Sequence, residues 1–174
     1  MKNIKTGTFR EARPGEKPLG GERDTGRVDD IDSPAGAIDA YRKFAARHGM
    51  PSLAVYPCCG LDVSPSYVFP KVVYIDNRPE VTSRLGEQGC DARLGDAIKI
   101  EVPEADLLIV MNPQVPLAEL ERFLKRGHLI CNNYHGTADE AARNPRFSFC
   151  EELETNLTDF YRARRSAGYF VFRR

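Results

Sequence analysis

The sequence predicts an α/β fold: an open, doubly wound and mostly parallel sheet that ends in a C-terminal antiparallel strand pair, with helices on both faces in a three-layer αβα arrangement. Short apolar segments alternate with helix signals from residue 52 onward, as in repeated β-α units. The apolar segments lack polar alternation, which is typical of strands that are buried on both faces. The last two segments, 146–151 and 168–174, do alternate and have no long helix pattern between them, so they indicate an antiparallel pair.

The composition fits one soluble domain. The chain has 174 residues, with 25 Lys and Arg against 25 Asp and Glu. A formal net charge of zero gives no overall field for holding nucleic acid or an anionic membrane. No apolar run approaches a membrane span, and the first residues lack the apolar core of a signal peptide. The five cysteines show no metal-ligand spacing, so we expect reduced thiols, no metal and a cytoplasmic protein.

The chain divides into an N-terminal arm, 1–33, and a single α/β domain, 34–174. The arm is dense in Gly, Pro and alternating charge and has almost no apolar periodicity. It could lie on its own domain or on a partner subunit, which leaves a homodimer as one alternative.

The domain begins with a helix over 34–48, for which Ser33 is the expected N-cap, Pro34 the first residue and Gly49 the stop signal. Five strands are expected after it, at 52–56, 72–75, 91–94, 106–111 and 128–131. The segment 62–69 is short of helix signal and predicts a single turn, with Ser64 as its cap.

Three further helices are expected between the strands. One covers 79–87; a second covers 116–125 and stops at Gly127. Thr137 and Glu140 have the spacing of a capping box and predict the start of a third, short helix.

Each of the five strands is followed by polar or turn-forming residues. Because ligands of such sheets bind outside the carboxyl ends of the strands, a shared ligand explains five polar endings better than chance does. These endings are 57–62, 76–77, 95–97, 112–114 and 132–135.

The order of these strand endings resembles the class I S-adenosylmethionine-dependent methyltransferases, over about 52–174. The resemblance implies that a glycine-containing loop with Gly60 passes under the methionine part of the cofactor, that Asp76 holds the ribose hydroxyls, and that Asp96 meets the adenine amino group. The full set of cofactor residues expected from it is Tyr56, Pro57, Cys58, Gly60, Asp62, Asp76, Asn77, Asp96, Ala97 and Asn112.

Each acid also has a plainer interpretation. Asp76 precedes Pro79 and suits a helix N-terminus, while Asp96 suits a loop or cap. Asp62 could accept from the ammonium of a ligand, or it could be a turn carboxylate. The loop also departs from the family in offering Gly60 as its one glycine.

Asn112 and His135 are the candidate catalytic residues. Asn112-Pro113 is similar to the motif with which amino-methylating members of the family orient a planar nitrogen substrate, although here no aromatic residue follows. A turn at a helix entry is the alternative. His135 follows a strand at the same rim and could act as a general base, or it could be an ordinary surface histidine.

The sequence therefore favours a protein that binds S-adenosylmethionine, a small-molecule cofactor, and transfers its methyl group to an acceptor that the sequence does not identify. One alternative is a non-catalytic module that has lost cofactor binding. The other is a nucleotide- or nucleic-acid-binding protein that uses the C-terminal arginines, Arg162, Arg164, Arg165, Arg173 and Arg174.

Overall fold

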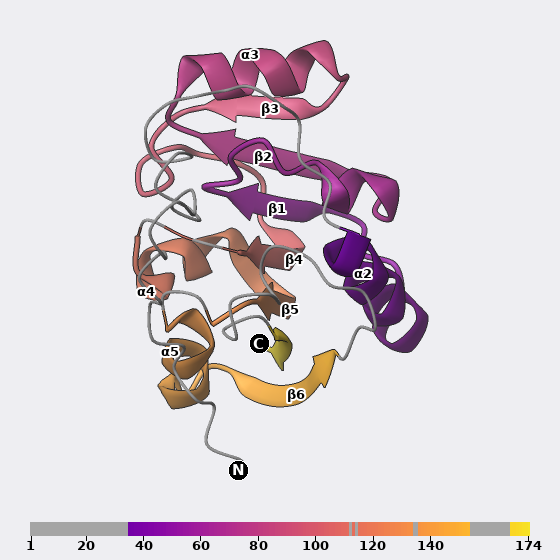
Figure 1. Cartoon of the computed structure of the whole chain (residues 1–174). Coiled ribbons are helices and arrows are strands. Elements are labelled where there is room, and N and C mark those ends of the chain that lie inside the picture. Colours follow the sequence, from indigo (N-terminus) through magenta and orange to yellow (C-terminus); the bar gives the residue numbers. More distant parts are fainter. Residues whose placement is uncertain (1–34, 112, 114, 134–135, 154–167) are drawn as a thin grey trace, which may run out of the picture.

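In the computed structural model, one seven-stranded sheet organises the chain (Figure 1). The structure describes residues 35–111, 113, 115–133, 136–153 and 168–174. The strands lie in the order β3-β2-β1-β4-β5-β7-β6, and β1 to β5 are parallel while β7 is antiparallel to both of its neighbours. Their bounds are β1 Ala54–Pro57, β2 Val72–Asp76, β3 Asp91–Leu94, β4 Ala105–Val110, β5 Leu124–Cys131, β6 Ser148–Leu153 and β7 Tyr169–Arg173.

Helices cover both faces of this sheet, which gives the three layers (Figure 1). The first face packs against α2 (Ala35–His48) and α3 (Pro79–Glu87), together with the short 3-10 helix η1 (Ser64–Tyr67). The second face packs against α4 (Leu117–Leu120), η2 (Glu121–Phe123) and α5 (Thr137–Arg143). No helix among the described residues is long and apolar enough to cross a membrane.

The central strands contribute side chains to both layers in strict alternation. Tyr56 of β1 and Tyr74 of β2 belong to the first core, whereas Val55 and Val73 belong to the second. Since both faces are buried, these strands can be apolar throughout, and this explains the continuous apolar runs of the sequence. The predicted fold class is confirmed, including the C-terminal antiparallel pair.

The expected helix over 116–125 is wrong at its C-terminal end. Helical structure ends at Phe123, and Leu124 already pairs with Ala105 as the start of β5. Gly127 is therefore not a helix stop. It lies in β5 at a register shift, with a φ of 137°, and an added Cβ would lie 2.0 Å from the Asp106 carbonyl oxygen. Glycine is needed there because the backbone of β4 comes too close for any side chain.

Two predicted helix caps are also wrong. Gly136, with a φ of 78°, is the N-cap of α5, and Thr137 is not a capping residue. Glu140 does not reach back along its own helix; its carboxylate accepts the Leu117 N–H at the start of α4. The predicted single turn at 62–69 is present as η1, but its N-cap is Val63 and not Ser64. The expected cap Ser33 lies outside the described residues.

The C-terminal end of α2 meets the antiparallel part of the sheet through two histidines. The ring centroids of His48 and His128 lie 4.7 Å apart, and Phe44 packs on both rings. His48 Nε2 lies 2.7 Å from a carboxylate oxygen of Glu151 on β6. Burial lowers the pKa of His128, and the charges of His48 and Arg173 lower it further, while Asp106 opposes them.

This arrangement predicts a loss of stability in mild acid. Because the folded pKa of His128 lies below its unfolded value of about 6.5, the unfolded chain takes up more protons below that pH. The contribution of His128 to the free energy of unfolding should not change with pH above about pH 7. Below that, the free energy of unfolding should fall as the pH drops through about 6. Urea unfolding of the wild type and of His128→Gln at several pH values measures the difference. Identical pH slopes for the two proteins would contradict the prediction.

Candidate functional site

The carboxyl ends of β1, β2 and β3 lie side by side and form the rim at which a ligand would be expected. Pro57 at the end of β1 pairs with Ile75, and Asp76 at the end of β2 pairs with Leu94 of β3. The strand order reverses between β1 and β4, since β2 and β3 lie on one side of β1 while β4 and β5 lie on the other. A reversal of this kind leaves a crevice at the strand ends.

The loop after β1 turns sharply through two residues with left-handed backbone conformations. Gly60 has a φ of 56° and Cys58 has a φ of 54°. Between them, the Cys59 N–H donates to the Ile75 carbonyl oxygen at 3.3 Å. Cys58 thus adopts a backbone conformation that is usual for glycine. The loop therefore turns as it would if both position 58 and position 60 were glycine.

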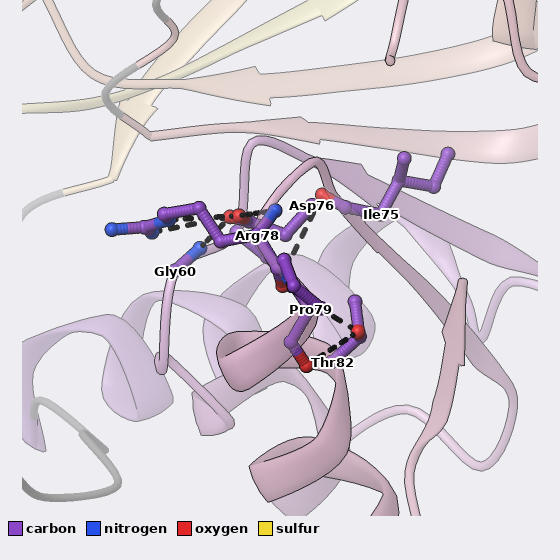
Figure 2. Close-up of polar contacts among 7 residues, drawn as sticks. Gly60, Ile75, Asp76, Arg78, Pro79 and Thr82 are labelled. Carbon is purple, nitrogen blue, oxygen red and sulfur yellow. Dashed lines mark hydrogen bonds and ion pairs between the residues drawn. The ribbon is translucent and has the colours of Figure 1, made fainter. Parts of the chain in front are cut away.

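Asp76 holds this loop to the end of β2. Its side chain is 4% exposed, and its carboxylate accepts four hydrogen bonds. Oδ1 accepts from the backbone N–H of Arg78 at 3.1 Å and from its Nε at 2.9 Å. Oδ2 accepts from the Gly60 N–H at 3.0 Å and from Arg78 Nη2 at 3.3 Å. The contacts from Gly60 and Arg78 converge on this carboxylate (Figure 2).

Arg78 is the N-cap residue of α3 and turns its guanidinium back onto Asp76. The hydrogen bonding of the Arg78 guanidinium to the Asp76 carboxylate raises the pKa of Arg78 above its usual range, against the opposing effect of burial. A Cβ placed on Gly60 would lie 3.6 Å from Arg78 Nη2, so the guanidinium lies beside the first loop. Asp76 therefore contacts the N-terminus of α3 and the first loop at the same time, so its interpretation as a helix N-terminal acid does not exclude its interpretation as a cofactor acid.

The third strand ending reaches the same rim through its backbone. The Gly95 N–H donates to the Asp76 carbonyl oxygen at 3.0 Å. The next residue, Asp96, is partly exposed; its carboxylate accepts the Ile98 N–H and lies 3.5 Å from Lys99 Nζ. Ala97 is buried in the second core, and Asn77 is exposed at the end of β2. Gly60, Asp76 and Asp96 thus follow three neighbouring strands at one rim.

Asp62 is part of the internal structure of the first loop. It is 3% exposed and accepts the Ser64 N–H at 2.8 Å and the Tyr56 hydroxyl at 3.0 Å. These contacts are those of a turn carboxylate that also satisfies the buried Tyr56 hydroxyl.

The acceptor side of the rim is described only in part, because Asn112, Gln114, Tyr134 and His135 lie outside the described residues. Asn132, which follows β5, is fully buried and donates to the Met111 carbonyl oxygen at 3.4 Å. Asn133 accepts the Asp139 N–H and so holds the start of α5 against this rim.

The other candidate groups that the structure describes, which are the Cys59 thiol, possible metal ligands and the C-terminal Arg174, give no sign of a catalytic or binding role. Burial raises the pKa of the Cys59 thiol, and the nearby carboxylates of Asp76 and Asp62 raise it further, so this thiol stays protonated. No group of three or more His, Cys, Asp or Glu side chains in the described part of the chain could hold a metal ion. Arg174 donates to the carbonyl oxygens of Glu121 and Leu124, while Arg162, Arg164 and Arg165 lie outside the described residues.

Sequence reasoning missed one residue of this rim, Arg78, and did not foresee the backbone conformation of another, Cys58, which it expected among the cofactor residues. Cys58 gave no signal as a left-handed residue because cysteine is uncommon in that conformation. Arg78 was passed over because it follows Asp76 by two residues, a spacing that suggests a helix entry and gives no sign that the side chain folds back. A search for basic side chains within two or three residues of a candidate acid would have found it.

Solved structures of methyltransferases have the same architecture. The chain is similar to the N-methyltransferase NodS from Bradyrhizobium japonicum WM9 in complex with S-adenosyl-L-homocysteine, with a TM-score of 0.65 and 12% identity over 89% of this chain and 97% of that one. It is also similar to a methyltransferase from Geobacter sulfurreducens, with a TM-score of 0.57 and 17% identity over 93% of this chain and 90% of that one. No family model and no curated protein matches the sequence. The chain therefore has the Rossmann-like fold of the class I methyltransferases.

The left-handed conformation of Cys58 leads to a prediction about the stability of variants at this position. Cys58→Gly should leave the free energy of unfolding unchanged or raise it by up to about 1 kcal/mol, because glycine adopts this φ without strain but gains entropy when unfolded. Cys58→Val should lower it by about 2 kcal/mol, because a β-branched residue is strongly disfavoured there. Urea denaturation at neutral pH compares the two variants. Equal stability of the Val and Gly variants would be the contrary result.

Proposed function

We propose that this protein binds S-adenosylmethionine in the crevice beyond β1, β2 and β3 and catalyses transfer of its methyl group. The observation that supports the proposal most directly is the connection between Gly60 and the buried carboxylate of Asp76, at adjacent strand ends of a sheet with the methyltransferase fold. That connection brings the loop expected beneath the methionine part to the acid expected to hold the ribose.

The chemistry of the donor set fits such a cofactor. A carboxylate can accept from both hydroxyls of a ribose diol at once, and Asp76 presents both oxygens at the rim. In the bound state, two backbone N–H groups, of Gly60 and Arg78, would hold those oxygens in place. Asp96, two residues beyond β3, is the proposed partner of the adenine amino group. Its exposure leaves room for a ligand beside it.

The cofactor would supply an activated methyl group on a sulfonium, so the work of the chain is mainly positioning. The rigid strand ends hold the first loop through Asp76 and through the Cys59 N–H. Asn112 is proposed to orient the acceptor and His135 to accept its proton; Asn112 follows β4, the neighbour of β1, and His135 follows β5, the next strand of the sheet. Asp62 is proposed to act indirectly on the methionine part of the cofactor, by fixing the conformation of the first loop, which would contact that part.

A non-catalytic module is the second candidate, and one specific observation favours it. The carboxylate of Asp76 already accepts four hydrogen bonds, two of them from the Arg78 guanidinium. Four is about the capacity of a carboxylate, so no position is left for a diol in this arrangement. The two candidates therefore differ in whether Arg78 leaves Asp76 when a ligand arrives.

The proposal extends to the location of the protein. We propose a cytoplasmic location, which is supported by five cysteines that form no disulfide with one another.

Calorimetric titration with S-adenosylhomocysteine tests the enzyme-like function. We expect binding in the micromolar range, and Asp76→Asn should weaken it about tenfold or more, because the amide offers one acceptor oxygen where the carboxylate offers two. The amide still accepts the Arg78 N–H and so preserves the entry to α3.

Asp91→Asn is a suitable control, since Asp91 lies in β3 and pairs with Arg93 in the same way without belonging to the rim. It should bind as the wild type does. Absence of measurable binding by the wild type at millimolar ligand would favour the non-catalytic module, unless the Arg78 variants described below do bind.

A further inference from the structure

The guanidinium of Arg78 occupies the two acceptor positions that a ribose diol would need. The four hydrogen bonds on Asp76 fall into two kinds. Two come from backbone N–H groups, of Gly60 and Arg78, which the loop and the helix entry fix in place. The other two come from Nε and Nη2 of one side chain, and they fall on different oxygens of the carboxylate.

The geometry of the second kind matches that of a diol. Arg78 Nε donates to Oδ1 and Nη2 donates to Oδ2, so one planar group gives one donor to each oxygen. The two adjacent hydroxyls of a ribose are likewise two neighbouring donors that can reach both oxygens of one carboxylate. Removal of the guanidinium leaves one vacant position on each oxygen, which is the number and placement that a diol requires.

Arg78 can leave without any change of the backbone. Its own N–H remains on Oδ1, and its carbonyl oxygen accepts from the Thr82 N–H in the first turn of α3. The side chain is 34% exposed, so solvent is available to the released guanidinium. Breaking the contact with Asp76 therefore requires new side-chain torsions and leaves the backbone at the entry to α3 in place.

We infer that Arg78 is an internal competitor for the ribose subsite: its guanidinium stands in for the ligand's diol in the free protein, and an adenosine-bearing ligand binds by displacing it. This inference rests on the proposed function and deepens it, because it makes Arg78 a residue that sets the affinity of the site. The ligand class is a nucleoside with both ribose hydroxyls. Replacing a cation by a neutral diol leaves the charge of Asp76 stabilised by the two N–H groups and the N-terminus of α3.

The test is calorimetry on the full chain with three probes: S-adenosylhomocysteine, adenosine, and 2′,3′-dideoxyadenosine, which lacks both hydroxyls. Arg78→Gln should bind the first two about tenfold more tightly than the wild type, because a charged bidentate pair no longer has to be broken. It should gain nothing for the dideoxy probe. Arg78→Lys, which keeps the charge but offers a point donor, should show a smaller gain.

The chain contains a closely matched control. Arg93 makes the same two-point contact with Asp91, two residues before it, at 2.7 Å and 3.1 Å, but on the exposed edge strand β3. Arg93→Gln should leave all three affinities unchanged. Thermal unfolding of each variant checks that the proteins compared are folded, and Arg78→Lys serves in place of Arg78→Gln if the latter is not.

The outcomes separate the two proposals. Tighter diol-dependent binding by Arg78→Gln supports the inference, whether or not the wild type itself binds. Binding by the wild type that Arg78→Gln leaves unchanged or weakens overturns the inference and leaves the proposed function intact. An equal gain for the dideoxy probe also overturns it, since the gain would not come from the hydroxyls. No binding of any probe to wild type or variants overturns both.

Discussion

The rim of this sheet depends on the pairing of one buried carboxylate. Asp76 is almost fully removed from solvent, and a buried charge is tolerated only when its oxygens are well hydrogen-bonded. Its side chain binds the loop after β1 and the entry to α3, while its carbonyl oxygen accepts the Gly95 N–H after β3. Three strand endings are therefore held together at one residue, and the arrangement of the rim depends on that requirement.

The same requirement explains how a loop with one glycine can make so sharp a turn. Residues in sparsely populated backbone regions persist when their surroundings determine their conformation. Cys58 lies between β1, whose last residue pairs with Ile75, and the N–H of Cys59, which donates to the same Ile75. Gly60 is then fixed by Asp76. Anchors on both sides hold Cys58 in a left-handed conformation that its sequence context alone does not encode.

The sequence was sufficient for the sheet and insufficient for the details of its rim. Apolar runs predicted four of the five parallel strands because burial on both faces demands them, whereas the edge strand β3 is mostly exposed and has no such run. The rim acids were found because they lie at or just after the strand ends. The end of the helix near Gly127 was wrong, since the glycine answers a close approach of β4, a contact between segments that local patterns do not contain. The contact of Arg78 with Asp76 was missed for a related reason: it depends on a side-chain torsion.

The same Arg78 side-chain torsion also bears on whether the site can still bind a cofactor or has lost that ability. To cap α3 through the Arg78 N–H requires one oxygen, which an amide would supply without the cost of burying a charge. The second oxygen accepts from the Gly60 N–H and from Arg78 Nη2. Helix capping alone therefore does not explain why this residue is a carboxylate, whereas its contacts at the rim do. A crevice filled by packed apolar side chains could not be reopened without disrupting the core. Here the occupying group is a partly exposed side chain on a fixed backbone, and such a group can yield to a ligand that offers the same two donors.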